Sequence, residues 1–453
     1  MIARVLVANR GEIAVRVIAS CRAAGLQVVA VYSEADRTGL WTRIADRAIC
    51  IGPARSADSY LNAPALVAAA KGSGCDAVHP GYGFLAENAA FAAMCEDEGL
   101  TFIGPSSESI ANMGNKIAAR RLAQAAGVPT VPGSQGRLES AREARAAGER
   151  CGYPLLLKAA AGGGGRGMRV VRSPSDLSER FAEAEAEARA AFGDGSLYAE
   201  RFLEGVRHIE VQILADAFGN TIHIGERDCT LQRRSQKLLE EAPAVVLKPA
   251  TRDELLSCAV ELARSIRYRS LGTIEFVYEP ASSKFYFLEM NTRIQVEHPV
   301  TEMIAGIDLV AQQLLVAKGE RLALQQEQIR LTGHAIECRI NAEDPEHDFR
   351  PSPGTIAAWS PPRSAGVRVD SHVYEGYAIP PFYDSMIAKL IVGGANRERA
   401  LARAREALER FRIEGPKTTR DFHARLLGDV RVAENRTDTK WIEREYLPEM
   451  AAL

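Results

Sequence analysis

The sequence predicts a protein of mixed α/β and α+β class, with a doubly wound N-terminal domain followed by a larger α+β region. Residues 4–110 alternate short apolar runs with amphipathic stretches, for example LQVVAVY and GEIAVRVIASCRAAG, which is the pattern of a parallel sheet covered by helices. A Gly/Pro-rich stretch at 126–136 then marks a boundary, and beyond it strand-like and helix-like segments mix. With 453 residues, the chain is long enough for two or three packed domains.

The composition is that of an ordinary globular protein. Hydrophobic residues make up 46% and charged residues 25%, and a formal net charge of -2 argues against a dominant nucleic-acid or membrane surface. No apolar run approaches the roughly 18 residues needed to cross a bilayer, and the chain enters the strand-like VLVAN without a leader. The 8 cysteines form no C-x-x-C pair and lie in apolar or helical stretches, so we expect buried free thiols and a cytoplasmic protein.

Three segments after the first strand add detail to the predicted fold. The turn that follows the first strand, NRGEIA, lacks the glycine fingerprint of dinucleotide-binding proteins, so NAD is not expected. Residues 131–203 predict a small α+β unit, in which a helix rich in Ala, Arg and Glu precedes the strand YPLLLKA. A long helix is expected near the end of the chain, at NRERALARAREALERFRI.

A glycine run follows the strand that carries Lys158. Four consecutive glycines at 162–165 have no Cβ, so their N–H groups could wrap around phosphate oxygens, with Lys158 as a cationic partner. The alternative is a hairpin tip that binds nothing, and no P-loop is present because no GKS or GKT follows. Lys116 opens a predicted helix whose dipole would also attract phosphate, unless it is an ordinary surface lysine.

Two further segments could complete a nucleotide site. In YAERFLEGVRHIEVQ, the backbone of residues 200–203 could receive an adenine edge, and His208 could reach phosphate or ribose. The segment GERDCTLQRRSQK gathers cations around Gln232, which indicates either an anion site or a solvated charged face. The cations are Arg227, Arg233, Arg234 and Lys237.

Residues 272–299 predict a hairpin that sets two carboxylates against each other. With the turn centred near Ser282, Glu275 falls opposite Glu289, and like charges facing each other across a ladder are destabilising unless a divalent cation lies between them. Asn291 adds a neutral oxygen on the same face, a ligand set that suits magnesium bound to a nucleotide phosphate. The alternative is a solvated strand face. If the extended conformation persists, the same face also presents Arg293, Gln295 and Glu297.

Together these motifs resemble the biotin carboxylase family over nearly the whole chain. The matching segments, in order, are VLVANRGEIA, HPGYGFLAEN, KAAAGGGGRGM, ERDCTLQRRSQK, EMNTRIQVEHPVTEM, GHAIECRINAEDP and PPFYDSMIAKL. The resemblance implies a Rossmann-like pre-ATP-grasp domain at 1–113, an ATP-grasp domain at 114–317 with a glycine-rich lid at about 131–203, and a biotin carboxylase C-terminal domain at 330–453. It also implies a reaction in which ATP and bicarbonate form carboxyphosphate, which then carboxylates biotin.

The family's functional residues fall on matching positions of this sequence. Its magnesium or manganese ligands fall on Glu275, Glu289 and Asn291, and Glu297 matches the base that deprotonates bicarbonate. Arg339 matches the position that binds biotin, and Arg293 would stabilise the ureido oxygen. Bicarbonate would contact Lys237, Arg293, Gln295 and the backbone of Val296. The nucleotide contacts fall on Lys116, Lys158, Gly164, Gly165, Glu200, Arg201, Leu203, His208 and Gln232, together with the metal ligands Glu275 and Glu289.

Two positions depart from the family pattern. Ser235 stands where histidine or asparagine is usual, so one hydrogen bond near the nucleotide is expected to be shorter or water-mediated. Arg201 replaces a usual lysine, which should be tolerated if the backbone makes the adenine contact.

Two alternatives belong to other classes. Another bicarbonate-using ATP-grasp ligase, such as a carbamoyl-phosphate-forming enzyme, would share the glycine run and metal pair but would have no reason to carry ECRINAEDP. A non-catalytic nucleotide-binding regulator would be expected to have lost at least one of Glu275, Glu289, Lys237 and Arg293, and all four are present.

The resemblance also implies partners. None of the ten lysines has a methionine beside it, so we expect biotin to arrive as a substrate on a carrier protein or domain instead of being attached to this chain. A carboxyltransferase would then use the carboxylated biotin, and members of the family often form homodimers.

Overall fold

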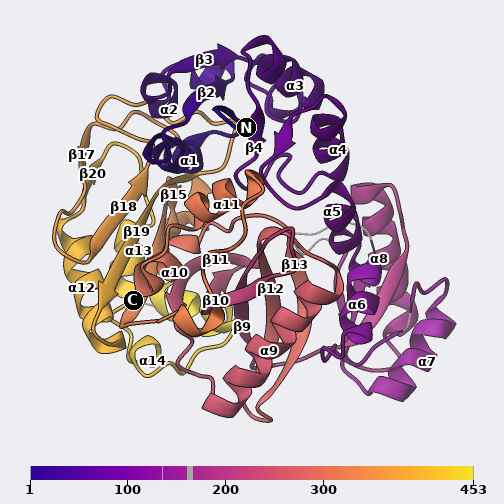
Figure 1. The fold of residues 1–453 in the computed structure, drawn as a ribbon. Coiled ribbons are helices and arrows are strands. Elements are labelled where there is room, and N and C mark those ends of the chain that lie inside the picture. Colours follow the sequence, from indigo (N-terminus) through magenta and orange to yellow (C-terminus); the bar gives the residue numbers. More distant parts are fainter. Residues whose placement is uncertain (1, 135, 161–166, 452–453) are drawn as a thin grey trace.

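The computed structural model describes residues 2–134, 136–160 and 167–451. Figure 1 shows the N-terminal part at the top, a small unit with α7 and α8 at the lower right, and the C-terminal part on the left. A large sheet lies between them and joins the middle of the chain to its end.

The N-terminal domain is the predicted doubly wound parallel sheet. Its five strands have the order β3-β2-β1-β4-β5, and all neighbours run parallel. The strands are β1 (Arg4–Val7), β2 (Gln27–Tyr32), β3 (Arg47–Cys50), β4 (Ala77–His79) and β5 (Thr101–Phe102). The helices are α1 (Gly11–Ala23), α2 (Leu40–Ile44), α3 (Ala63–Gly72), α4 (Ala89–Asp97) and α5 (Ser107–Gly114). Ligands of such sheets bind beyond the carboxyl ends of the strands, and the segments after β1 and β4 lie there.

A small α+β unit follows α6 (Lys116–Ala125), as predicted for residues 131–203. Its three antiparallel strands have the order β7-β6-β8, with bounds β6 (Leu155–Ala159), β7 (Arg169–Val171) and β8 (Leu197–Arg201). The alternate residues Leu155 and Leu157 pack with α7 (Ala141–Cys151) and α8 (Leu177–Phe192), and these residues form the hydrophobic core of the small unit. Of the predicted phosphate-binding glycines, Gly164 and Gly165 lie outside the described residues.

The central sheet has eight strands in the order β13-β12-β9-β10-β11-β14-β19-β18. The pairing of β11 with β14 carries the sheet from the ATP-grasp range into the C-terminal range, so the two predicted domains share one sheet. The bounds are β9 (Arg207–Ala215), β10 (Thr221–Arg233), β11 (Gln236–Ala242), β12 (Ser270–Glu279), β13 (Lys284–Asn291), β14 (His334–Asn341), β18 (Val367–Ser371) and β19 (Met386–Gly394).

The strand β9 shows how the sheet separates core from site. Its residues Ile209, Val211 and Ile213 pack in one cluster with α9 (Pro249–Ser265), and the residues between them are polar although they are also buried. Because side chains alternate between the two faces of a strand, the polar ones point to the opposite side.

The remaining elements cover the sheet and close the C-terminal part. They are α10 (His298–Ala305), α11 (Leu309–Ala317), α12 (Arg397–Arg410), α13 (Arg420–Leu426), α14 (Val430–Ala433), a π-helical turn (Ile442–Tyr446) and α15 (Leu447–Ala451), with short strands β15 (Glu343–Asp344), β16 (Arg350–Pro351), β17 (Ala358–Ser360) and β20 (Arg412–Glu414). The helix expected near the end of the chain is α12. Among the described residues no helix alone is long and apolar enough to span a membrane, although α10 and α11, bent by 96°, meet those criteria as a pair.

The expectation that all cysteines are buried is wrong for three of them. Cys50 is exposed, and Cys151 and Cys258 are partly exposed, while the other five are buried and all eight are free. Cys50 ends the edge strand β3, where no further strand covers it.

Candidate active site

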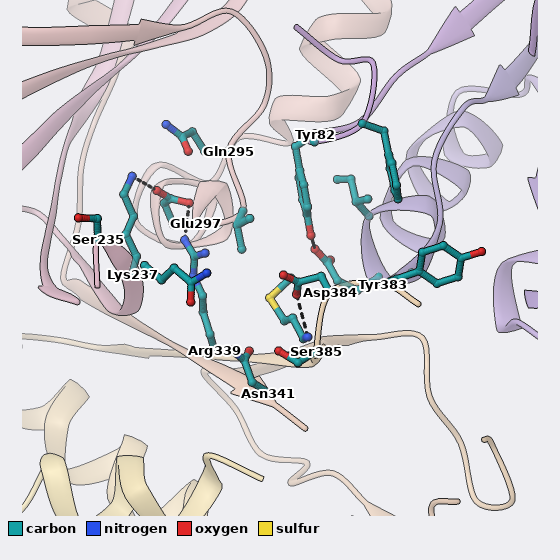
Figure 2. Close-up of a pocket in the computed structure, with 18 of the residues that line it drawn as sticks. Tyr82, Ser235, Lys237, Gln295, Glu297, Arg339, Asn341, Tyr383, Asp384 and Ser385 are labelled. Atoms are coloured by element: carbon teal, nitrogen blue, oxygen red, sulfur yellow. Dashed lines mark hydrogen bonds and ion pairs between the residues drawn. The ribbon is translucent and has the colours of Figure 1, made fainter. Parts of the chain in front are cut away.

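One cavity of about 1110 Å³ opens between the N-terminal domain, the small α+β unit and the central sheet. Its lining includes Glu12 and Tyr82 from the N-terminal domain, Lys158 from β6, and Arg339 from β14. Figure 2 shows Tyr82, Lys237, Gln295, Glu297 and Arg339 around this space. The volume exceeds the range of about 300–1,000 Å³ that is typical of one small-molecule pocket, which leaves room for more than one ligand.

The predicted carboxylate pair is confirmed by the register of the hairpin. Glu275 on β12 faces Glu289 on β13, and β13 carries a bulge, because the next pair is Phe276 with Phe287. The extra residue is Leu288, and both Leu288 and Glu289 line the cavity. A bulge re-aims side chains in this way, and its position could not be read from the alternation of the sequence.

The two carboxylates differ in environment. The Glu289 side chain is 39% exposed, with its Oε2 3.8 Å from Lys116 Nζ, while the Glu275 side chain is only 6% exposed. Partial burial, followed by the Glu275 charge, raises the pKa of Glu289. Burial alone would also raise the pKa of Glu275, but the Lys237 ammonium and then His208 outweigh it and lower that pKa well below its usual value.

The oxygen donors at this edge fit a hard divalent cation. Asn291 donates from Nδ2 to Glu275 Oε1 (2.8 Å), and its own Oδ1 accepts from Arg293 Nη2 (3.0 Å). Two carboxylates and one amide oxygen are ligands that Mg²⁺ or Mn²⁺ prefers, and the pKa of Glu289 is raised first by burial and then by the Glu275 charge, which a cation between the two carboxylates would offset. The residues present therefore fit the predicted metal.

The predicted nucleotide residues divide into two groups. Lys116, Lys158, His208 and Gln232 line the cavity, whereas Glu200, Arg201 and Leu203, on β8 and in the linker after it, are not among the lining residues. The Glu200 carboxylate accepts hydrogen bonds from Lys158 Nζ and from Arg120 Nη1, both at 2.6 Å. Burial would lower the pKa of Lys158, but Glu200 raises it, so this lysine remains a cation.

Backbone donors near Leu203 limit where an adenine edge can bind. The N–H groups of Arg201 and Phe202 already donate to the carbonyls of Pro132 and Pro154, each at 2.8 Å. Among the described residues, no carbonyl accepts the Leu203 N–H. We therefore expect Leu203, rather than Arg201, to supply the backbone donor, which agrees with the tolerance expected for the lysine-to-arginine change at position 201.

Lys237 occupies the centre of the site. Its Nζ lies 2.7 Å from Glu210, 3.0 Å from Glu275 and 2.6 Å from Glu297. Burial would lower the pKa of Lys237, but these carboxylates, Glu210 first, raise it well above its usual value. Beneath it, the fully buried Arg227 donates from Nε to the other oxygen of Glu210 at 2.5 Å. Glu210 was not predicted, although the polar residues alternating through RHIEVQ were a signal that could have found it.

Glu297 lies between two cations, as Figure 2 shows. Its Oε1 accepts from Lys237 Nζ and its Oε2 accepts from Arg339 Nη2, at 2.6 and 3.0 Å. The side chain is fully buried, which would raise its pKa, but Lys237 and then Arg339 lower it. At neutral pH Glu297 is therefore an ionised carboxylate whose basicity is suppressed by its partners.

The extended conformation does not persist to residue 297, so the condition for placing Arg293, Gln295 and Glu297 on one strand face is not met. After Asn291 the chain bends, and Glu297 becomes the N-cap of α10 in a turn. Pro299, at the start of that helix, prevents a further ladder hydrogen bond and is favoured at a helix N-terminus. The bend nevertheless brings Arg293, Gln295 and Glu297 to the cavity, because all three line it.

The two arginines assigned to biotin have different carboxylate partners. Arg293 Nε donates to Glu87 Oε2 at 2.8 Å, and Arg339 Nε donates to Glu240 Oε1 at 2.5 Å. Glu87 and Glu240 were not singled out from the sequence. Glu87 belongs to HPGYGFLAEN, far from Arg293 along the chain, so only the tertiary fold reveals the pair.

The cations around Gln232 do not form one anion site. Lys237 lines the cavity and Arg227 lies beneath it, but Arg233 and Arg234 pair with Asp348, away from the cavity lining. Arg233 ends β10 and Arg234 begins the turn that follows, so both lie beyond the part of the strand that carries Arg227 towards the site.

Three family models match successive parts of the chain. They are the biotin carboxylase N-terminal domain over residues 1–110, the carbamoyl-phosphate synthase L chain ATP-binding domain over 115–325, and the biotin carboxylase C-terminal domain over 337–444.

Whole-length relatives agree with these models. The chain is 52% identical over 443 residues to biotin carboxylase 1 of Bacillus subtilis, a match covering 98% of each chain. A biotin carboxylase from Campylobacter jejuni, solved as a β-γ-ATP complex, has a TM-score of 0.96 and 48% identity, with 98% of this chain and 99% of that chain covered. The biotin carboxylase domain dimer of Hydrogenobacter thermophilus 2-oxoglutarate carboxylase, with MgADP, ADP and bicarbonate, has a TM-score of 0.94 and 49% identity, covering 98% and 97%. The chain belongs to the biotin carboxylase family.

Proposed function

We propose that this protein uses ATP and bicarbonate to carboxylate biotin carried on another protein or domain. The observation that carries the proposal is the placement of Glu297 between Lys237 and Arg339, where one carboxylate contacts the cations assigned to bicarbonate and to biotin. The full-length similarity to biotin carboxylases supports the same assignment.

ATP would lie between the small α+β unit and the central sheet. Lys116, Lys158 and His208 provide cationic or hydrogen-bonding groups at the cavity, and Leu156, Met168 and Leu288 provide an apolar surface for the base. Mg²⁺ held by Glu275, Glu289 and Asn291 would offset charge on the transferring phosphoryl group. Because Lys237 already contacts Glu275, it can hold bicarbonate next to that phosphoryl group.

Bicarbonate would bind by taking over hydrogen bonds that Glu297 now receives. The hydrogen bonds from Lys237 and Arg339 suppress the basicity of Glu297. When Lys237 turns to the bicarbonate anion and Arg339 to biotin, Glu297 loses part of this stabilisation and becomes a stronger base. It can then take the bicarbonate proton while a bicarbonate oxygen attacks the γ-phosphorus, which releases ADP and forms carboxyphosphate.

In the second step, the ureido nitrogen of biotin would take the carboxyl group as the C–O bond of carboxyphosphate breaks, and the departing inorganic phosphate would accept the proton that the ureido nitrogen loses. Arg293 and Arg339 both line the cavity and can face the negative charge that develops on the ureido oxygen. Their partners Glu87 and Glu240 hold both guanidinium groups in place before biotin arrives.

We also propose the assembly in which this reaction takes place. A carrier protein or domain brings biotin to the cavity, a carboxyltransferase consumes the product, and two copies of this chain associate. The dimer described for the 2-oxoglutarate carboxylase domain supports the last point. The eight free cysteines support a reducing compartment such as the cytoplasm.

The test is ATP cleavage by the purified protein with and without bicarbonate and free biotin. We expect cleavage that depends on bicarbonate and increases with biotin. Bicarbonate-dependent cleavage that biotin does not change would instead indicate another ATP-grasp ligase, and nucleotide binding without cleavage would indicate a regulator.

A further inference from the structure

A buried lysine from the C-terminal part of the sheet contacts the main chain of the loop that carries Glu297. Lys389 lies on β19, and its side chain is fully buried. Its Nζ donates to the carbonyl oxygen of Val296 at 2.8 Å. Lys389 does not line the cavity, so any effect on the reaction must pass through this loop.

The surroundings of Lys389 keep it charged and fixed. Glu12 of α1 lies 3.2 Å from its Nζ with a side chain only 1% exposed, and Asp370 of β18 lies 4.0 Å away. Burial would lower the pKa of Lys389, but Glu12 and then Glu337 raise it. Burying an ammonium group costs several kcal/mol unless it is paired and hydrogen-bonded, so its contacts with Glu12 and Val296 are the ones that compensate for its burial.

The same contacts join three parts of the chain. Glu12 comes from the N-terminal domain and also accepts a hydrogen bond from the Tyr82 hydroxyl, which lines the cavity. Lys389 comes from the C-terminal part of the sheet, and Val296 lies between the hairpin and α10. No disulfide or backbone ladder holds residues 292–297 among the described residues, so side chains restrain this loop: Glu87 accepts from the Thr292 N–H, Gln295 donates to Glu275, and Lys389 holds the Val296 carbonyl.

The position of this hydrogen bond is specific. The Val296 carbonyl belongs to the peptide that links Val296 to Glu297, so fixing that peptide plane fixes the direction in which the Glu297 side chain leaves the backbone. We propose that Lys389, supported by Glu12, is a positioning residue that orients the 295–297 loop for bicarbonate. This inference rests on the proposed function, because it assumes that Gln295, Val296 and Glu297 act on bicarbonate.

The proposal predicts a selective kinetic defect. A displacement of about 1 Å at a reacting group can reduce a rate by about 10²-fold. We expect Lys389→Met, which keeps the length of the side chain but removes its charge and donor, to raise the KM for bicarbonate in ATP cleavage by about 10-fold or more. The KM for ATP should change by less than about 2-fold, because no nucleotide residue touches Lys389. Lys389→Arg, which keeps a charged donor, should recover part of the loss.

The matched control is Asp370→Asn. It removes one further carboxylate near Lys389, 4.0 Å away, without touching the Val296 carbonyl, and we expect the KM for bicarbonate to stay within about 2-fold of wild type. If Lys389→Met does not fold, as judged by circular dichroism, Glu12→Gln tests the positioning role of Lys389 instead. It removes the charge that supports Lys389 while keeping a neutral acceptor, and it should raise the same KM by a smaller factor.

The outcomes separate this inference from the proposed function. Wild-type protein without bicarbonate-dependent cleavage would overturn the proposed function itself. An active wild-type protein, with variants whose KM for bicarbonate is unchanged or whose parameters for ATP and bicarbonate decline equally, would overturn only the positioning role of Lys389.

Discussion

The Glu297 carboxylate is fully buried and shares its two oxygens between Lys237 and Arg339. Removing one partner of such a cluster leaves the others without compensation, whereas changing the carboxylate to an amide keeps its shape. Glu297 is therefore the residue at which chemistry and packing can be separated by a single substitution.

We predict that Glu297→Gln will lower bicarbonate-dependent ATP cleavage by about 10²-fold or more, the scale of losing one general base. The amide cannot take a proton from bicarbonate, but nucleotide binding should persist because Lys116, Lys158 and His208 remain. Steady-state cleavage and nucleotide binding by calorimetry measure the two effects. Wild-type cleavage by the variant would exclude Glu297 as the base.

At the scale of elements, the hairpin of β12 and β13 brings two carboxylates to one edge of the cavity. The bulge at Leu288 aims neighbouring residues into the same space, and Lys116 at the start of α6 lies close to Glu289.

We predict that Glu289→Gln will raise the magnesium concentration needed for half-maximal ATP cleavage by about 10-fold, because one charged ligand is lost. Without metal, the variant should be as stable as wild type or more stable by less than about 1 kcal/mol, since the repulsion with Glu275 is partly screened by solvent. Glu279→Gln, at the far end of the same hairpin and outside the cavity lining, is the control. The same magnesium requirement in both variants would contradict the metal assignment.

His79, at the end of β4, is a buried histidine that is held in its neutral form. Its Nδ1 accepts from the Gly81 N–H at 3.0 Å, and its Nε2 lies 3.2 Å from Gln313 Oε1 on α11. Burial lowers the pKa of His79 to about 4, so in the folded protein it takes up a proton only in acid.

His79 should therefore make the folded protein sensitive to acid. Its contribution is fully present above the unfolded pKa of about 6.5 and is lost as the pH falls towards 4, because the unfolded chain binds the proton first. The loss approaches about 3 kcal/mol at 1.36 kcal/mol per pKa unit. We predict that His79→Gln will be less stable at pH 7 but will lose less stability between pH 7 and 5, as measured by urea midpoints.

The control for this comparison is His347→Gln, since the His347 side chain is 59% exposed. Its ring lies 2.8 Å from Asp344, but an ion pair with an exposed partner contributes little to stability, so this variant should change the pH dependence much less than His79→Gln does. Parallel curves for His79→Gln and wild type would show that His79 does not contribute to acid sensitivity.

At the scale of the whole molecule, segments far apart in the sequence meet at one cavity. Features that depend on local sequence patterns could therefore be predicted, whereas contacts between distant segments could not. The parallel N-terminal sheet and the pairing of Glu275 with Glu289 depend on periodicity and on a short turn, so local patterns were enough. The bulge at Leu288 and the bend after Asn291 break those patterns. The pairing of Arg293 with Glu87 joins residues 206 positions apart, which no local pattern specifies.

The continuous central sheet also shows that a domain boundary predicted from sequence does not separate the strands that form the site. The predicted division between 317 and 330 falls in a connection, yet β11 and β14 pair across it and carry Lys237 and Arg339 on adjoining strands. Sequence motifs located both residues, whereas their common contact with Glu297 depends on the strand order.

The central claim is that this chain acts on biotin without carrying it. The most direct measurement is ATP cleavage by the purified protein with bicarbonate alone, with free biotin, and with a biotinylated carrier protein, together with an avidin blot of the denatured chain. We predict no avidin signal, slow bicarbonate-dependent cleavage that free biotin stimulates at millimolar concentration, and a much larger rate with the carrier, whose tether raises the effective concentration of biotin. A strong avidin signal from this chain, or no response to either form of biotin, would contradict the account.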